Sequence, residues 1–311
     1  MLLGAFLLIA CVPASGGVAG ERVLKGTETL GHRGNAPLYS VSGISVDGHG
    51  NIFVTDILEY AVKKFDPCGR LVARTGRRGS GPGEFRAPTL SVAAGGRVVV
   101  VQVEDPRIEI FDTGLVFREE VRVSGGLPVD LAQAGGGAFA VALCGDSTSA
   151  EVLLYRPGRH EQPARLRLSP TGCRLPLYAA VRVGFSPGGR IVAAYLFLNR
   201  VEIYSRRGRL LRRFAVAGMP CRIAEPGDRR IPEETYFRKV LVDTDGSIIL
   251  LGGNQGPHPG RDLFICSSSG NVRRRLVLPS RARTLSLGGA HRLLAASEDG
   301  TAVIMYNLEW N

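Results

Sequence analysis

The stretch that decides the fold is Val46-Asp-Gly-His-Gly-Asn-Ile-Phe-Val-Thr-Asp56, followed by Ala61-Val-Lys-Lys-Phe-Asp66 and Gly69-Arg-Leu-Val-Ala-Arg-Thr-Gly76. Runs of β-branched and aromatic residues alternate here with turns rich in Gly, Asn and Asp. Each run predicts a short strand, and each turn predicts a tight hairpin. The unit therefore reads as four antiparallel strands, over Ile44–Val46, Ile52–Thr55, Ala61–Phe65 and Leu71–Thr75.

The same pattern recurs along the chain, with further units that begin at Leu90, Leu131, Val183, Val240 and Leu285. Their spacing of about 40 to 57 residues is typical of four-stranded propeller blades. The last unit ends after its third strand, Ala302–Tyr306, so the segment Arg22-Val-Leu-Lys-Gly26 is the expected donor of its outer strand. Such an exchange leaves no open blade edge. We expect an all-β, six-bladed β-propeller of four-stranded antiparallel blades over residues 21–311, closed by an N-terminal strand.

The first unit also carries a family resemblance. Val46–Asp56 and Val62–Asp66 resemble the NHL repeat, and Gly76–Phe85 followed by Pro88 resembles the loop between two such repeats. The resemblance is strong over residues 41–123 and continues in register to the C-terminus. The third and sixth units depart most, because Ala134-Gly-Gly-Gly137 and Gly289-Ala-His291 replace the usual Asp-x-x-Gly turn. A seven-bladed WD-repeat ring is the alternative fold, but its Gly-His…Trp-Asp signature is absent from the sequence.

The N-terminal residues 1–20 predict a signal or lipoprotein-type leader. The apolar run Leu2–Ala10 is too short to span a bilayer as a helix. Leu8-Ile-Ala-Cys11 resembles the bacterial lipoprotein box, which makes Cys11 a candidate lipidation site. An ordinary signal peptide cleaved within residues 14–20 and a buried strand are the alternatives. We expect export, to the periplasm or as a cell-envelope lipoprotein.

Two of the remaining cysteines are candidates for a disulfide. Cys173 and Cys221 lie in successive loops between blades, and neighbouring blades place such loops side by side. A Cys173–Cys221 bridge would suit an exported protein. Cys144–Cys173 is the competing pair.

Positive charge gives the candidate binding site. The net charge of +11 favours anionic partners, although scattered arginines are also expected from a GC-rich genome. In a propeller the loops between blades share one face, here called the loop face, with the loops between second and third strands. Aligned first strands place Arg182, Arg238, Lys239 and Arg283 together at this end of the channel, with Arg77, Arg78 and His258 on the same face. Guanidinium groups bind carboxylate or phosphate, so the sequence predicts an anion-binding mouth. Pairing with Glu233 and Glu234 is the alternative.

Catalytic signals are weaker. Acidic residues recur after the second strands, namely Asp56, Glu59, Glu104, Asp105, Asp146, Glu298 and Asp299. Lactonase-like and sugar-dehydrogenase-like propellers resemble this architecture and bind a cation with such carboxylates, but no local spacing forces these residues together. A His-Glu-His lyase site needs two histidines on one face, and only His258 is placed there. We therefore predict no catalytic residue, no metal site and no cofactor.

The resulting functional expectation is a non-catalytic, exported and monomeric binding scaffold. Its expected ligand, on the loop face, is a protein, a peptide or an anionic glycan. No nucleic acid is expected as a partner, and a membrane only through a lipid anchor. One alternative is a metal-dependent enzyme, lactonase- or lyase-like, with its site at the channel mouth. Another is an RNA-binding NHL propeller, which would require a cytoplasmic location.

Overall fold

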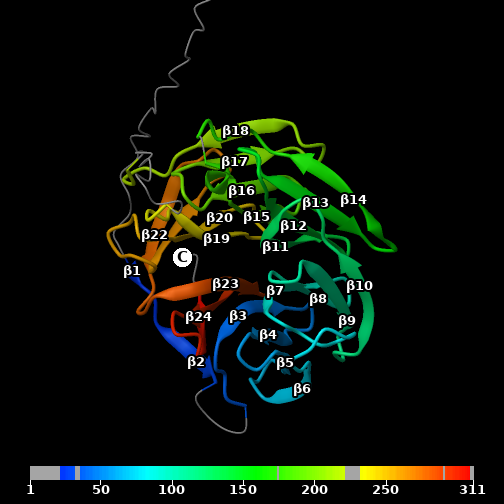
Figure 1. Cartoon of the computed structure of the whole chain (residues 1–311). Helices are drawn as coiled ribbons and strands as arrows, with labels where there is room; N and C mark the ends of the chain where they lie inside the picture. Colours follow the sequence, from blue (N-terminus) through cyan, green and yellow to red (C-terminus); the bar gives the residue numbers. More distant parts are fainter. Residues whose placement is uncertain (1–21, 32–35, 174, 221–231, 290, 309–311) are drawn as a thin grey trace, which may run out of the picture.

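The computed structural model describes residues 22–31, 36–173, 175–220, 232–289 and 291–308. These residues form six β-sheets that stand as blades around a central channel (Figure 1). The six-bladed β-propeller of antiparallel blades is thus confirmed. The one helical element in the described residues is a 3₁₀ helix, η1 (Pro176–Ala179), in the linker between blades 3 and 4.

Each blade takes its strands in chain order from the channel outward. Blade 1 contains β3 (Val41–Val46), β4 (Ile52–Asp56), β5 (Ala61–Phe65) and β6 (Leu71–Thr75). Blade 2 contains β7 (Pro88–Ala94), β8 (Arg97–Gln102), β9 (Arg107–Asp112) and β10 (Phe117–Arg122). Blade 3 contains β11 (Leu127–Gly135), β12 (Ala138–Cys144), β13 (Glu151–Arg156) and β14 (Arg159–Arg167).

The second half of the ring repeats this order. Blade 4 contains β15 (Val181–Phe185), β16 (Ile191–Tyr195), β17 (Val201–Tyr204) and β18 (Leu210–Phe214). Blade 5 contains β19 (Phe237–Val242), β20 (Ile248–Gly252), β21 (Asp262–Cys266) and β22 (Val272–Val277). Blade 6 contains β23 (Ala282–Gly288), β24 (Arg292–Ser297), β25 (Val303–Asn307) and, from the N-terminal side, β2 (Gly26–Leu30).

The ring is closed by an N-terminal strand, as predicted, but the donor segment differs from the expected one. β2 pairs antiparallel with β25, with Leu30 opposite Val303. The first residues of the expected donor instead form β1 (Arg22–Val23), which pairs parallel with β22 and gives blade 5 a fifth strand (Figure 1). Burial explains the shift, because Leu24 is buried in the core between blades 5 and 6 and Leu30 in the core between blades 6 and 1.

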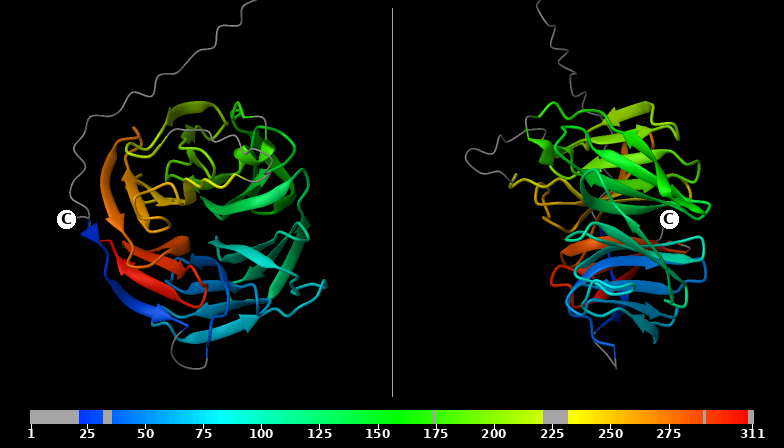
Figure 2. Two further views of the ribbon diagram at one scale, coloured as in Figure 1. Left: turned by 60° about the vertical axis from the view of Figure 1, so that its left-hand side comes forward. Right: turned by 45° about the vertical axis from the view of Figure 1, so that its right-hand side comes forward.

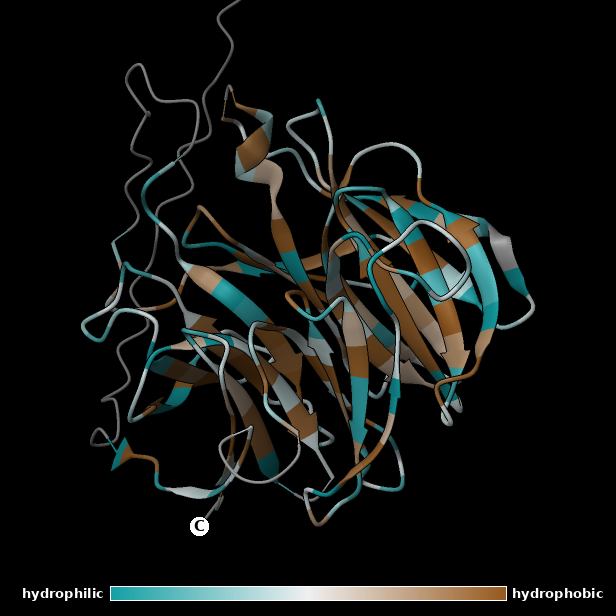
Figure 3. Cartoon of the chain, turned by 60° about the horizontal axis from the view of Figure 1, so that its bottom comes forward, coloured by the Kyte–Doolittle hydropathy of each residue, from teal (hydrophilic) through white to brown (hydrophobic). Residues whose placement is uncertain are grey.

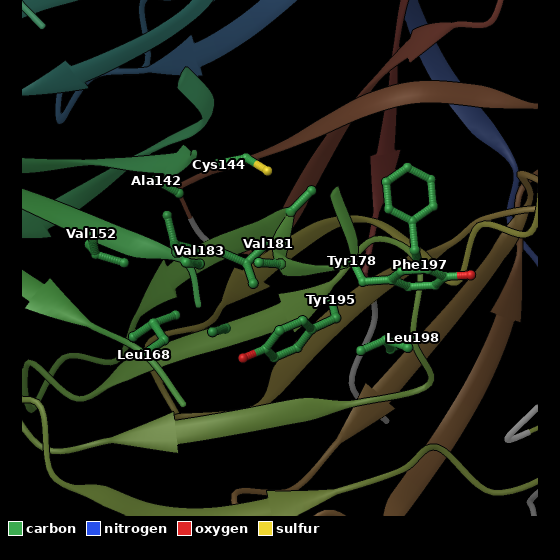
Figure 4. Packing of buried hydrophobic residues seen from close by; sticks show 14 of the residues in the cluster. Ala142, Cys144, Val152, Leu168, Tyr178, Val181, Val183, Tyr195, Phe197 and Leu198 are labelled. Atoms are coloured by element: carbon green, nitrogen blue, oxygen red, sulfur yellow. The ribbon is translucent and has the colours of Figure 1, made fainter. Parts of the chain in front are cut away.

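The hydrophobic core lies between neighbouring blades. Second strands such as β4 and β16 are buried along their whole length, whereas the outer strands β6 and β18 are largely exposed. Figure 4 shows one interface, in which residues of blade 3 such as Val152 meet residues of blade 4 such as Val183 and Tyr195. Figure 3 shows hydrophobic residues along the strands and more hydrophilic ones in many of the connecting turns. Burying each large aliphatic side chain contributes about 1.5–3 kcal/mol.

The connections divide between the two ends of the channel (Figure 2). The turns from first to second strand and from third to fourth strand lie at one end, here called the turn face. The loop face at the other end carries the remaining connections. Buried polar side chains hold the linkers there: the Asp56 carboxylate accepts hydrogen bonds from the Tyr39 and Ser40 amides at 2.8 and 3.0 Å. Gln102, at the same register position in blade 2, accepts one from the Arg86 amide at 2.7 Å.

Candidate functional site

The predicted cations do gather at the loop-face end of the channel, where they join one blade to the next. Arg182 of blade 4 donates through Nε to the carbonyl oxygen of Arg238 in blade 5, at 3.0 Å, and through Nη1 to that of Val129 in blade 3. Lys239 of blade 5 reaches blade 3, where its Nζ lies 2.6 Å from Asp130 Oδ1. Burial lowers the pKa of Arg182, the Asp130 charge raises it, and the nearby Arg238 charge lowers it further.

The other two channel cations are also engaged. Arg238 forms a two-pronged ion pair with Glu298, with nitrogen–oxygen distances of 2.6 and 3.2 Å. Arg283 of blade 6 donates to Ser40 Oγ of blade 1 at 3.0 Å and to the carbonyl oxygen of Glu298 at 2.9 Å. The acidic partners of these cations are therefore Asp130 and Glu298. The nitrogen donors of the channel cations bind acceptors within the ring, which leaves the loop-face mouth little capacity for an external anion.

The remaining predicted residues lie apart from this group. Arg77 pairs with Glu84 at 2.6 Å inside the linker from blade 1 to blade 2, and Arg78 in the same linker lies over the Tyr60 ring. His258 lies in the loop from β20 to β21, where its backbone amide donates to Asp262 Oδ2 at 3.0 Å. No contact in the described structure links Arg77 or Arg78 to the channel cations.

The candidate site that the structure itself presents is a cavity in the turn-face half of the channel. Its volume is about 750 Å³, and its walls are the later residues of the first strands together with the turns that follow them. Lys239 is the residue of the loop-face cations that reaches it. A volume of this size is typical of small-molecule sites, which span roughly 300–1,000 Å³.

Hydroxyl and amide groups interrupt the apolar lining of this cavity. They belong to Ser45, Ser91, Gln133, Ser186, Thr244 and Ser286. Within the described structure the buried Oγ atoms of Ser45 and Ser91 have no hydrogen-bond partner. An unsatisfied buried hydroxyl costs about 1–3 kcal/mol, and both serines line the cavity. The lining is therefore poised to form hydrogen bonds with a polar ligand.

Charged groups stand at the turn-face mouth of the cavity. Asp243 Oδ1 accepts a hydrogen bond from the Thr244 amide at 2.6 Å, and its Oδ2 lies 3.9 Å from His291 Nδ1. Arg156 and Arg206 complete the rim. Sequence reasoning missed this site, because its residues come from all six blades and no single stretch contains them. The available signal was a serine within the apolar run of several first strands, as at Ser45, Ser91 and Ser286.

The described residues contain no group of three or more His, Cys, Asp or Glu placed to hold a metal ion. Of the predicted acids, Asp56 and Glu59 pair with Lys63, and Asp105 pairs with Arg122. Over the same part of the chain no helix is long and apolar enough to cross a bilayer.

The cysteine predictions fall partly outside the described residues, because Cys11 and Cys221 both lie there. Cys173 is buried in the core between blades 3 and 4, together with Cys144. Cys144 carries a free thiol whose Sγ lies 3.6 Å from the carbonyl oxygen of Pro176. The structure therefore contains no bridge between Cys144 and Cys173.

Comparison with known proteins identifies the fold. No family model and no curated protein sequence matches the chain. It is similar to the structure of a regucalcin, a calcium-binding protein of Agrobacterium tumefaciens, with 14% identity, a TM-score of 0.60 and coverage of 94% of this chain and 98% of that one. A gluconolactonase of Xanthomonas campestris matches with 14% identity, a TM-score of 0.59 and coverage of 88% and 87%.

A catalytically inactive virginiamycin B lyase of Staphylococcus aureus, solved with quinupristin, matches with 10% identity, a TM-score of 0.58 and coverage of 91% and 89%. Identities this low establish shared architecture, and function must be argued from the site. The conclusion from these comparisons is that the chain is a six-bladed β-propeller.

Proposed function

We propose that this protein is a non-catalytic binding propeller that takes a hydroxyl-bearing polar ligand in its central cavity from the turn face. The observation that carries the proposal is the cavity of about 750 Å³ whose lining contains buried serine hydroxyls without a partner in the described structure. A ligand that satisfied them would recover the cost of their burial. The rigid ring around the cavity keeps the ordering cost of binding low.

The same proposal moves the binding site away from the loop face. The loop-face cations hold neighbouring blades together through Asp130, Glu298 and backbone carbonyl oxygens. An external anion would have to displace these bonds. In the turn-face cavity, the Ser45 and Ser91 hydroxyls form no hydrogen bond within the described structure. A ligand there would form hydrogen bonds without first breaking existing ones, and would therefore bind more tightly.

Two further expectations belong to this proposal. The repeat Val46–Asp56 supports placing the chain among NHL-type propellers, and the leader-like residues 1–20 support export to the cell envelope. Localisation of a tagged full-length chain, and globomycin sensitivity of its processing, would test export and lipidation at Cys11. A protein found wholly in the cytoplasm would overturn this part of the proposal.

The binding proposal is tested by a thermal-shift screen of soluble oligosaccharides against the intact protein. A ligand at 100 times its Kd stabilises the native state by about 2.7 kcal/mol. We expect at least one oligosaccharide to raise Tm, and Ala132→Phe, which fills the cavity from its wall, to remove that shift. The matched control Arg77→Gln, on the loop face, should retain it. A shift lost in Arg77→Gln and kept in Ala132→Phe would contradict the proposal.

The metal-dependent enzyme is tested on the same protein. Ca²⁺ and Zn²⁺ bind a true site in the native state and raise Tm with a saturable concentration dependence. The binding proposal expects no saturable rise with either ion. A saturable rise, abolished by replacing acids around the loop-face mouth such as Glu298→Gln, would favour the enzyme instead.

A further inference from the structure

The turn-face edge of blades 3 and 4 carries exposed arginines, here called the arginine edge. Its members are Arg156, Arg159, Arg190, Arg206, Arg207 and Arg209. They come from the β13–β14 hairpin and from the two turns of blade 4, in the upper right of Figure 1. No Asp or Glu occurs in the turn segments 133–138, 156–160, 186–190 and 205–209. None of these arginines forms an ion pair with a described residue, so their charges add.

We propose that the arginine edge binds an anionic glycan, one end of which occupies the central cavity. The inference rests on the proposed function, because it names the ligand class of the same cavity and extends the site onto the surface beside it.

In blades 1 and 2 the turn from third to fourth strand begins with an aspartate, so the lack of acidic residues is particular to the arginine edge. In blade 1, Asp66 starts the turn from third to fourth strand: its Oδ1 accepts the Arg70 amide at 2.9 Å, and its Oδ2 pairs with the Arg70 side chain at 3.0 Å. In blade 2, Asp112 starts the same turn and pairs with Arg118 at 2.5 Å. In both blades the turn residue therefore neutralises the arginine beside it.

Blade 4 builds the same turn without the negative charge. Ser205 takes the place of Asp66, and its Oγ accepts the Arg209 amide at 3.1 Å. The backbone bonds match: Asp66 N to Arg70 O is 2.8 Å, and Ser205 N to Arg209 O is 2.8 Å. Ser186 caps the Arg190 amide in the preceding turn at 3.1 Å in the same way. Since serine satisfies the turn, Arg190 and Arg209 keep charges that no turn carboxylate offsets.

The arginine edge is continuous with the cavity. Arg206 Nε donates to the carbonyl oxygen of Gly188 at 2.8 Å, which ties the two turns of blade 4 together and fixes the side chain at the cavity rim. Arg156 lines the rim from blade 3. A ligand anchored in the cavity would pass these two guanidinium groups first and the rest of the edge beyond them.

The chemistry of the two parts selects the ligand. Guanidinium groups bind carboxylates and sulfates, whereas the serine, threonine and glutamine side chains of the cavity suit a ligand with hydroxyl groups. The Asp243 carboxylate at the mouth can accept hydrogen bonds from ligand hydroxyl groups. Phe185 is the single aromatic side chain of the lining, so stacking of nucleobases is poorly served. A bilayer cannot enter a cavity, and thus an anionic glycan fits both parts best.

The test measures binding of a fluorescent oligogalacturonate and a heparin octasaccharide to the intact protein. The informative variant is Ser186→Asp/Ser205→Asp, which places aspartates at the two turn positions where blade 1 has Asp47 and Asp66. It should keep its Tm, because aspartate caps these turns equally well, and should bind either glycan about tenfold more weakly at low salt. Arg156→Gln/Arg206→Gln should give a similar loss. The matched control Arg70→Gln removes a paired turn-face charge and should bind as the parent protein does.

The outcomes separate this inference from the proposed function. Unchanged glycan binding in both double variants, with loss in Ala132→Phe, would overturn the arginine edge and leave the cavity as the binding site. Loss in the double variants with full binding by Ala132→Phe would contradict both the anchored ligand and the proposed function. A further outcome is that the glycans fail to bind, while single-stranded oligonucleotides or anionic vesicles bind the parent protein and lose binding in Ser186→Asp/Ser205→Asp. In that case the assignment to a glycan is wrong.

Discussion

One buried carboxyl group, that of Glu109, makes the folding stability of this propeller depend on pH. Glu109 on β9 is fully buried, and its Oε1 and Oε2 accept hydrogen bonds from Gln102 Nε2 at 2.7 Å and from the Gly83 amide at 3.0 Å. Burial raises the pKa of Glu109 to about 7, against the opposing charge of Arg107. Glu109 holds the linker from blade 1 to blade 2 in place through its bond to Gly83. Ionising its buried carboxyl group costs folding free energy.

The sign of this effect is opposite to that of an exposed, paired carboxylate. Because the native state keeps the Glu109 proton up to a pKa of about 7, whereas the unfolded chain releases it near the ordinary 4.5, stability falls as pH rises between these values. For Glu109→Gln we expect this decline to vanish. The free energy of unfolding of the parent, relative to the variant, should drop by about 2 kcal/mol between pH 5 and pH 8.

Urea unfolding of both proteins at the two pH values measures that difference. Backbone hydrogen bonds are the main cause of the lowered pKa values of three other carboxyls, those of Asp66, Glu84 and Asp112. These groups titrate equally in both proteins, so their contributions cancel in the difference between parent and variant. Parallel stability profiles for the parent and the variant would show that Glu109 ionises normally.

At the scale of elements, the N-terminal segment contains two strands with different roles. β2 completes blade 6, and Leu30 is 5% exposed in the core between blades 6 and 1. β1 adds to the outside of blade 5, and Val23 is 54% exposed there. Closure of the ring should therefore depend on β2 far more than on β1.

Leu30→Ala is expected to lower the free energy of unfolding by about 2–4 kcal/mol, because it leaves a cavity at the closing strand. Val23→Ala, the matched control, should change it by less than about 0.5 kcal/mol, as for most surface positions. Chemical denaturation of both variants gives the comparison. Equal effects from the two substitutions would mean that β2 does not close the ring as the structure indicates.

The sequence predicted these elements unevenly. Repeated runs such as Ile52–Thr55 located the inner strands of every blade, because turn chemistry and β-branched content are local properties. The division between β1 and β2 was not predictable in this way, since it depends on how Leu24 and Leu30 fit between blades. The turn-face cavity was missed for the same reason: its lining residues come together only when the ring closes.

For the whole molecule, bonds at the loop-face end of the channel connect successive blades. Arg283 joins blade 6 to blade 1, Arg238 joins blade 5 to blade 6, and Arg182 joins blade 4 to both of its neighbours. Ser42 joins blade 1 to blade 2 through the carbonyl oxygen of Pro88 at 2.8 Å. Three of the residues expected to bind an anion, Arg182, Arg238 and Arg283, thus form bonds that hold the ring together.

The pair of Lys239 and Asp130 is the strongest test of this arrangement, because it spans from blade 5 to blade 3 and its side chains are 13% and 2% exposed. Lys239→Met leaves the Asp130 charge buried without its partner, and should cost about 3 kcal/mol of unfolding free energy. Asp130→Asn can still accept the Val183 amide, so the double variant Asp130→Asn/Lys239→Met should recover much of that loss. A double-mutant cycle by chemical denaturation measures the coupling. A cost below about 0.5 kcal/mol for Lys239→Met would mean that this cation is not needed to hold the blades and is available to an anion at the loop-face mouth.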